Sequence, residues 1–141
     1  MKIAAVKQML LEMGKKIQLQ VHEETSESVT LHTQLVAKDY FDNSIYLRLV
    51  VFSSGTFHMF LTFDQMETTY DNLYLINAFN ENNPWFRAYI ANISGKDFLE
   101  LHYVSVSLQE ERQVIDSFGF LLNDLLSENI LKYLKPILTS N

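Results

Sequence analysis

The four histidines of this sequence are the side chains best suited to acid–base chemistry or metal binding near neutral pH. They are His22, His32, His58 and His102. Zinc sites often take two histidines from one element at close, regular spacing, and no two of these four lie that close together. We therefore expect histidines scattered over the surface, with no bound metal or other cofactor. In the alternation of their strands, His32, His58 and His102 are expected on the sheet face away from the helices, so a cross-strand metal site is the alternative.

Other catalytic groups form no recognisable pattern. The carboxylate pairs Glu23–Glu24 and Glu110–Glu111 fit a turn and a helix start, and the serines lie in turns and caps without a G-x-S-x-G motif. Four glycines in the whole chain leave no loop that could cradle a phosphate. The sequence thus predicts a protein that is not an enzyme.

The spacing of apolar residues changes along the chain from a helical period to a period of two and back. Helical spacing predicts helices over residues 2–13, 69–81 and 108–126. Gly14 suits the end of the first helix, Thr68 with Asp71 the start of the second, and Ser107 with Glu110 the start of the third. Pro136 is expected to close the tail.

Between these helices, alternation of apolar and polar residues predicts six strands, a four-stranded meander and a separate hairpin. Four strands follow the first helix, with turns at Asp42–Ser44 and at Ser53–Gly55. Two more follow the second helix and meet at Ser94–Gly95. The apolar residues that mark the strands begin with Ile17, Leu19 and Val21.

These elements predict an α+β fold in two layers. A six-stranded antiparallel sheet carries the helices on one face, in the order α-β-β-β-β-α-β-β-α. Residues 1–141 suit a single domain.

Composition narrows the class of partner. The chain has 141 residues, 48% of them apolar, and a net charge of −6. Its eleven basic residues are spread out, which argues against a nucleic-acid surface. No apolar stretch is long enough to span a membrane. The absence of cysteine suits a reducing cytoplasm.

The strand positions that alternate with the core positions carry more apolar and aromatic residues than a solvated sheet face needs. Such a patch is typical of an interface, and Tyr, Phe and Arg are enriched in interface cores. We expect this face to bind a protein partner or a second copy in a homodimer. Its residues are Tyr46, Arg48, Phe52, Phe60, Arg87, Tyr89 and Val104, with Val36 and Val50 on the same phase.

Two asparagines near the end of the second helix, Asn77 and Asn80, flank Phe79. We expect these three residues to be structural, with a buried Asn77 side chain bonded to main chain. A ligand-binding role is the alternative.

The same segment carries a family resemblance. The residues Asn77, Phe79 and Asn80 are followed by Phe86-Arg87-Ala88-Tyr89, by a strand over residues 98–106 and by a capped helix from Ser107. This arrangement resembles that of the YbjN-like proteins. The resemblance implies a fold related to type III secretion chaperones and a non-enzymatic, chaperone-like or adaptor role. The alternative is a small-molecule-binding or enzymatic domain with a pocket between sheet and helices.

Overall fold

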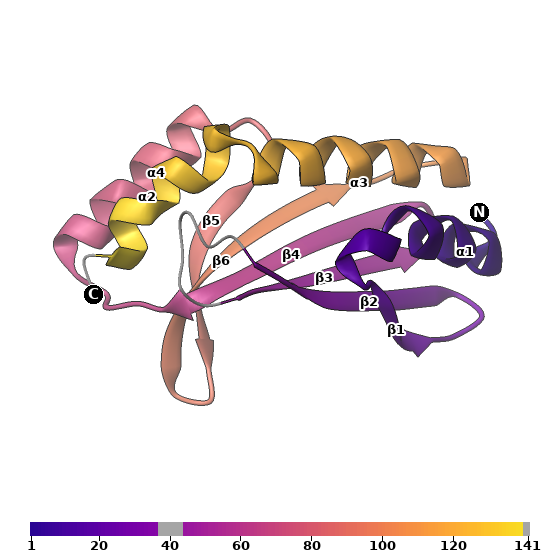
Figure 1. Cartoon of the computed structure of the whole chain (residues 1–141), viewed down its shortest axis with the longest axis horizontal. Helices are drawn as coiled ribbons and strands as arrows, with labels where there is room; N and C mark the ends of the chain where they lie inside the picture. Colours follow the sequence, from indigo (N-terminus) through magenta and orange to yellow (C-terminus); the bar gives the residue numbers. More distant parts are fainter. Residues whose placement is uncertain (37–43, 140–141) are drawn as a thin grey trace.

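The computed structural model describes residues 1–36 and 44–139, which form an open six-stranded sheet with helices against one face (Figure 1). The α+β class is confirmed, with one more helix at the end of the chain than the sequence predicted. In chain order the elements are α1 (Ile3–Met13), the 3-10 turn η1 (Lys15–Ile17), β1 (Gln20–Glu24), β2 (Ser28–Leu35), β3 (Ile45–Phe52), β4 (Thr56–Gln65), α2 (Tyr70–Asn82), β5 (Arg87–Ile93), β6 (Lys96–Ser105), α3 (Glu111–Leu126) and α4 (Glu128–Thr139).

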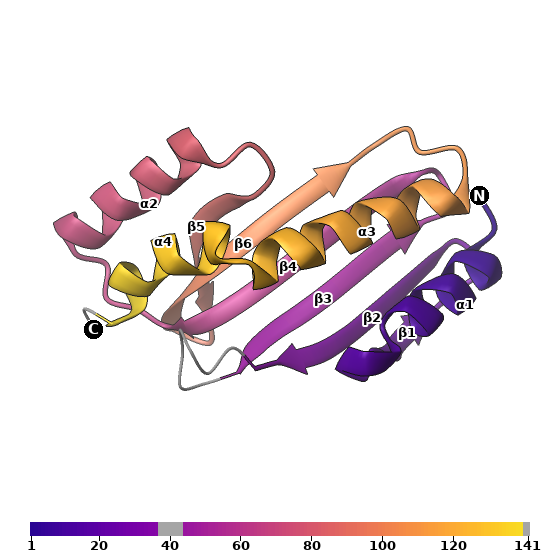
Figure 2. The same cartoon turned by 45° about the horizontal axis from the view of Figure 1, so that its top comes forward.

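The strands run in the order β1-β2-β3-β4-β6-β5, and every neighbouring pair is antiparallel (Figure 2). β6 therefore lies beside β4, and β5 forms an edge. The turn between β5 and β6 has positive φ at Ser94 (54°) and Gly95 (81°), as a two-residue hairpin with the native twist requires. Of the turn predicted at Asp42–Ser44, residues 42 and 43 lie outside the described residues.

The first helix ends where the sequence predicted. The Gly14 N–H donates to the Leu10 carbonyl at 2.8 Å. A Cβ at Gly14 would lie 2.6 Å from Cβ of Leu19, so the close approach of the following chain requires glycine. That approach also delays the first strand. Ile17, expected in the strand, lies in η1, and β1 begins at Gln20.

The second helix uses a different cap from the one predicted. Thr69 is the N-cap, and its Oγ1 accepts from the Asn72 N–H at 3.2 Å. Thr68 instead donates to Oδ2 of Asp97 at 2.9 Å, which ties the approach to α2 to the β5–β6 hairpin. The helix ends at Asn82, before Pro84.

The third helix begins at Glu111 rather than at residue 108. The residues before it are held to the β3–β4 turn, since the Leu108 N–H donates to the Gly55 carbonyl at 2.9 Å. Ser107 has a left-handed φ of 62° and is not the cap. The capping box is Glu110 with Gln113, and the Glu110 N–H donates to Oε1 of Gln113 at 3.1 Å.

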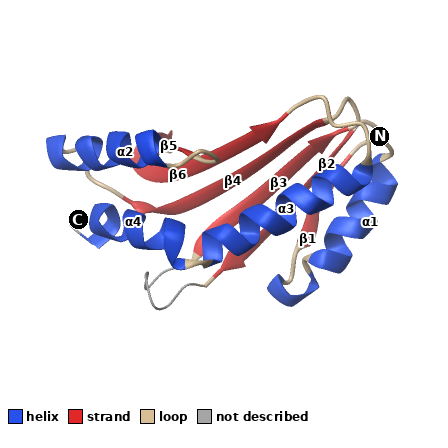
Figure 3. Cartoon of the chain, turned by 90° about the horizontal axis from the view of Figure 1, so that it is seen from above, coloured by secondary structure: helices blue, strands red, loops and turns tan. Residues whose placement is uncertain are grey.

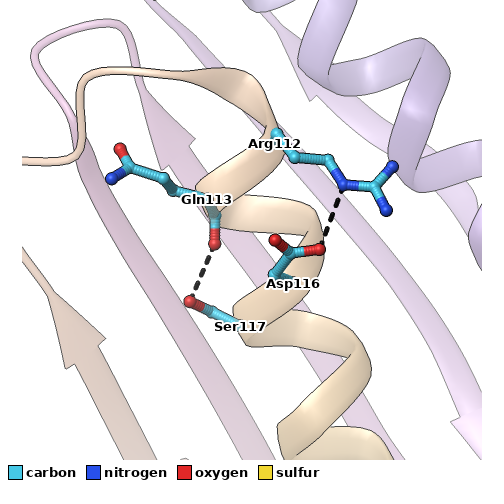
Figure 4. Close-up of polar contacts among 4 residues, drawn as sticks. All are labelled: Arg112, Gln113, Asp116 and Ser117. Carbon is cyan, nitrogen blue, oxygen red and sulfur yellow. Dashed lines mark hydrogen bonds and ion pairs between the residues drawn. The ribbon is translucent and has the colours of Figure 1, made fainter.

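The solvent side of the first turns of α3 carries two local contacts (Figure 4). Nε of Arg112 lies 3.1 Å from Oδ1 of Asp116, one turn along the helix. The Ser117 hydroxyl donates to the Gln113 carbonyl at 2.8 Å. Exposed pairs of this kind contribute only about 0.3–0.5 kcal/mol, so α3 depends on its buried face for stability.

The tail is helical, and the prediction that Pro136 closes it is wrong. Pro136 lies inside α4. Four residues on one face of this helix are fully or almost fully buried: Ile130, Leu131, Leu134 and Ile137. Burying each contributes about 1.5–3 kcal/mol, whereas a proline inside a helix costs about 3 kcal/mol. Packing therefore outweighs the local signal.

Viewed from above, α1, α3 and α4 lie over the sheet, and α2 lies beyond β6 near the β5 edge (Figure 3). The core between the layers is formed by one face of each helix and the inward residues of β2–β6. None of the described helices is both long and apolar enough to cross a membrane.

Candidate functional site

One face of the sheet is left uncovered by the described helices (Figure 1), and the strands alternate between it and the core. In β3, Leu47 and Leu49 are fully buried, whereas Arg48 and Val50 are partly exposed. We call the uncovered side the open face. All seven residues predicted for it lie there by alternation and register: Tyr46, Arg48, Phe52, Phe60, Arg87, Tyr89 and Val104. Their role stays a prediction.

Strand register aligns five side chains of the open face in one row across five strands. His32 pairs with Arg48, Arg48 with Phe60, Phe60 with His102, and His102 with Arg87. We call these five residues the central row. Side chains directly opposite each other on neighbouring strands are close enough to interact, so the row forms one continuous strip over β2, β3, β4, β6 and β5.

The middle of the central row is a stack. The Arg48 guanidinium carbon lies 4.5 Å from the centroid of the Phe60 ring. The His102 ring is almost parallel to the Phe60 ring, with centroids 4.4 Å apart. Contacts of a guanidinium with an aromatic face are attractive because the ring face is electron-rich. Nε of Arg48 is buried without a hydrogen-bond partner among the described residues, so the hydrogen-bonding capacity of this side chain is not used up.

His58 joins the stack from the neighbouring position on β4. Its Nδ1 lies 2.9 Å from Nε2 of His102, within hydrogen-bond distance. Its ring is also almost parallel to that of Phe60. Burial lowers the pKa of His58, and burial followed by the neighbouring His58 lowers the pKa of His102. Both imidazoles therefore favour the neutral form, which lets one accept a hydrogen bond from the other.

His32, His58 and His102 lie on the face away from the helices, as predicted, but the histidines are not scattered over it, contrary to the prediction. His22 and His32 are also in ring contact, with centroids 4.7 Å apart. His32 Nδ1 lies 2.8 Å from the Tyr46 hydroxyl. All four histidines gather on the open face because strand pairing brings distant positions together. Within residues 1–36 and 44–139, no group of three or more potential metal-ligating side chains is assembled.

A buried carboxylate lies next to the central row. Glu100 is only 8% exposed. Oε2 of Glu100 accepts from the Tyr89 hydroxyl at 2.8 Å, and Oε1 accepts from the Thr62 hydroxyl at 3.2 Å. Burial, followed by the bond and charge of Glu100, raises the pKa of Tyr89, so Tyr89 stays a protonated donor. This polar group is satisfied internally.

Apolar side chains border this polar centre. Phe52 is 39% exposed and packs edge-on against His58, and Val104, which pairs with His58 in register, is 46% exposed. Beyond the centre, Arg87 and Tyr89 line a hollow of about 520 Å³, together with His102 and Trp85. The open face is therefore amphipathic, with cationic and aromatic groups at its centre and apolar groups at its border.

The structure agrees with the structural role predicted for Asn80 and contradicts the predicted burial of Asn77. Asn80 is structural: its Nδ2 donates to the Ala88 carbonyl at 2.9 Å, and its Oδ1 accepts from the Ala88 N–H at 2.7 Å. Phe79 is buried in the core. Asn77, in contrast, is exposed, so its predicted burial is wrong. α2 continues to Asn82, and position 77 points away from its packed side. The buried amide is Asn72, which donates to the Glu67 carbonyl at 2.8 Å.

Sequence reasoning placed His58 and His102 on this face but missed their contact with each other, and it missed the polar pair Thr62 and Glu100 altogether. Alternation places each on the correct side of its own strand. It does not align one strand with the next, so pairs such as His58 with Val104 or Thr62 with Glu100 follow only from register.

A second hollow, of about 610 Å³, lies between α2 and α4 and not between the sheet and the helices. Leu75, Phe79, Tyr133 and Pro136 are among its lining residues. The space between sheet and helices is instead occupied by core side chains.

No protein-family model matches this chain, and no curated protein matches its sequence.

Proposed function

We propose that this chain is a non-enzymatic protein-binding module, a cytoplasmic chaperone-like adaptor that binds its partner through the open face. One observation carries the proposal: an uncovered sheet face with Phe52 and Val104 exposed around a stacked centre of Arg48, Phe60 and His102. Arg and aromatic residues are the types enriched at the centre of protein interfaces.

The resemblance to YbjN-like proteins, and through them to type III secretion chaperones, supports the same class of function. It rests on the Asn77-to-Asn80 segment and the strand from Arg87. Of these residues, Asn80 and Phe79 have structural positions, and Arg87 and Tyr89 lie on the open face.

A homodimer is the form we expect for the isolated protein. A two-fold axis allows one face to complement itself, and an interface of roughly 800 Å² per partner would cover the apolar border of the open face. Removing apolar area from water contributes about 25 cal/mol per Å², which favours association.

Sedimentation over a wide concentration range tests the proposal. We expect wild-type protein to dimerise and Val104→Glu to remain monomeric, because the glutamate would place a charge in the interface. Phe60→Glu should act in the same direction at the centre of the face. Tyr70→Glu, on the exposed outer side of α2, is the control and should dimerise.

Circular dichroism shows whether each variant is folded. A wild-type protein that stays monomeric throughout removes the homodimer and leaves a different protein as the partner. Equal dimerisation of wild type and of folded Val104→Glu and Phe60→Glu variants would instead show that the open face is not the interface.

A second candidate function is small-molecule binding in the hollow between α2 and α4, favoured by its size and its apolar lining by Leu75, Phe79 and Tyr133. Ala78, in the same lining, is the position to fill. Binding of an apolar fluorescent dye should be lost in Ala78→Trp and kept in Val104→Glu. A dye signal that Ala78→Trp leaves unchanged would refute this site.

A further inference from the structure

The open face carries two guanidinium groups that form no ion pair with a carboxylate of the described residues. Lys7 pairs with Glu24 and Arg112 with Asp116, whereas neither Arg48 nor Arg87 forms an ion pair within the described part of the chain. Arg48 has a buried Nε without a partner, and Arg87 is exposed at the wall of the 520 Å³ hollow. Both lie in the central row, separated by Phe60 and His102.

The positive charge of these two arginines is opposite in sign to the net charge of the chain. The protein has a net charge of −6, so two unneutralised arginines in one row differ from the average surface. The carboxylate closest in register, Glu100, is buried, and its oxygens accept hydrogen bonds from Tyr89 and Thr62. The Glu100 carboxylate could therefore form an ion pair with an arginine only by losing those hydrogen bonds.

The stack holds Arg48 in position for recognition. Its guanidinium carbon lies over the ring of Phe60, which is itself packed against His102. A guanidinium fixed in this way loses less side-chain entropy when it binds a carboxylate, and a planar fork suits two carboxylate oxygens at once. The hollow beside Arg87 leaves room for a side chain of the partner next to the second guanidinium.

We propose that the segment bound by the open face is an acidic peptide of another protein, whose carboxylates pair with Arg48 and Arg87 while its apolar side chains cover Phe52 and Val104. The proposal rests on the proposed function and names the chemistry of the partner. Cationic centre and apolar border together require a segment with acidic and apolar side chains on the same face. In an extended chain these are residues two positions apart, because successive side chains point to opposite faces.

Binding of three fluorescein-labelled peptides, measured by anisotropy at low salt, tests this partner. Each peptide has Tyr at every fourth position and Ser at the positions between, except that the residue two positions after each Tyr is Glu, Ser or Lys, so that both types of side chain lie on one face of an extended chain. We expect the Glu peptide to bind at least about tenfold more tightly than the Ser peptide, since one charge-assisted hydrogen bond contributes about 1.5–3 kcal/mol. The Lys peptide should bind most weakly, and added salt should weaken the Glu peptide most.

Variants locate the site. Arg87→Gln should reduce affinity for the Glu peptide about tenfold and leave the Ser peptide unchanged, because a hydrogen bond to a charged group is lost. Arg48→Gln should do the same. Arg112→Gln, the identical substitution on α3 in the helical layer, is the control and should bind as the wild type does. The Glu peptide should also dissociate any wild-type dimer, because both occupy the open face.

The outcomes distinguish a failure of the acidic-partner proposal from a failure of the proposed protein-binding function. Equal binding of the Glu and Ser peptides, or full affinity in Arg48→Gln and Arg87→Gln, overturns the acidic partner even where Val104→Glu abolishes dimerisation. Equal competition by a single-stranded RNA would show a general polyanion surface and would also overturn it. A separate result would refute the open face as the binding surface: a folded Val104→Glu variant with unchanged dimerisation and unchanged peptide binding.

Discussion

Nδ1 of His58 lies 2.9 Å from Nε2 of His102, across β4 and β6, at the centre of the open face. The two residues are 44 positions apart in the sequence, and each stacks on the ring of Phe60. Because their pKa values are lowered mainly by burial, this pair links the stability of the sheet to pH.

We expect the protein to lose stability as pH falls below about 6.5, the pKa of an unperturbed histidine. In that range the unfolded chain binds protons at His58 and His102 that the folded chain, with its lower pKa values, does not. The free energy of unfolding therefore rises with pH through this window and is at its full value above it. Arg48, nearby, opposes protonation of His102, and Glu100 favours it.

Urea denaturation at a series of pH values measures this effect. The double variant His58→Gln, His102→Gln should show a smaller loss of stability between neutral and mildly acidic pH than the wild type. The single variant His22→Gln, on β1, is the control and should keep the wild-type dependence. Identical pH profiles for the double variant and the wild type would contradict the linkage.

Asn80→Ala should destabilise the fold by about 1–3 kcal/mol, because it removes both hydrogen bonds to Ala88 and leaves a partly buried main-chain N–H and carbonyl without partners. Asn77→Ala, three residues earlier and exposed, should change stability by less than about 0.5 kcal/mol. Chemical denaturation of both variants measures the difference. Equal effects would mean that the Asn80–Ala88 bonds do not stabilise the junction of α2 and β5.

Gly55→Ala should cost more stability than Gly95→Ala. Both glycines have positive φ, 99° and 81°, where an alanine costs about 1–2 kcal/mol. A Cβ at Gly55 would in addition collide with the main-chain carbonyl of Leu108, whereas a Cβ at Gly95 meets no atom within 4 Å. Thermal denaturation should thus show the larger drop in Tm for Gly55→Ala. A smaller drop for Gly55→Ala than for Gly95→Ala would count against the close packing of residue 108 on this turn.

Protein purified without a histidine tag and dialysed should contain no stoichiometric zinc, copper or nickel. His58 and His102 supply two nitrogen donors, whereas a stable zinc site takes at least three protein ligands, and Arg48 places a positive charge beside them. Elemental analysis gives the metal content directly. One equivalent of metal, lost in His102→Gln and retained in His22→Gln, would assign a metal site to the stack.

Alternation and helical spacing were sufficient to predict the class of fold and the side of the sheet on which each candidate residue lies. Arg48 falls between Leu47 and Leu49, and both neighbours are fully buried, so a single strand carries that information. The binary pattern of core and surface is a local property of the chain.

Contacts between distant residues could not be predicted in the same way. The stack of Phe60 on His102 depends on the register of β4 against β6, and no local pattern specifies it. The observed helix caps also differ from the predicted ones because of contacts between distant residues. Ser107 has the sequence of a helix cap, but the bond from Leu108 to Gly55 holds this stretch outside α3. Pro136 likewise lies within a helix whose buried residues outweigh it.

The position of β6 between β4 and β5 also has a consequence for synthesis. β1 to β4 leave the ribosome first, and one edge of β4 stays unpaired until α2, β5 and β6 have followed. An unpaired strand edge readily pairs with another chain. The nascent protein thus passes through a stage in which β4 exposes its backbone and the central row lacks His102 and Arg87. The ability to bind a partner through this row is acquired only when residue 102 has left the ribosome, and slow translation before that point should favour aggregation.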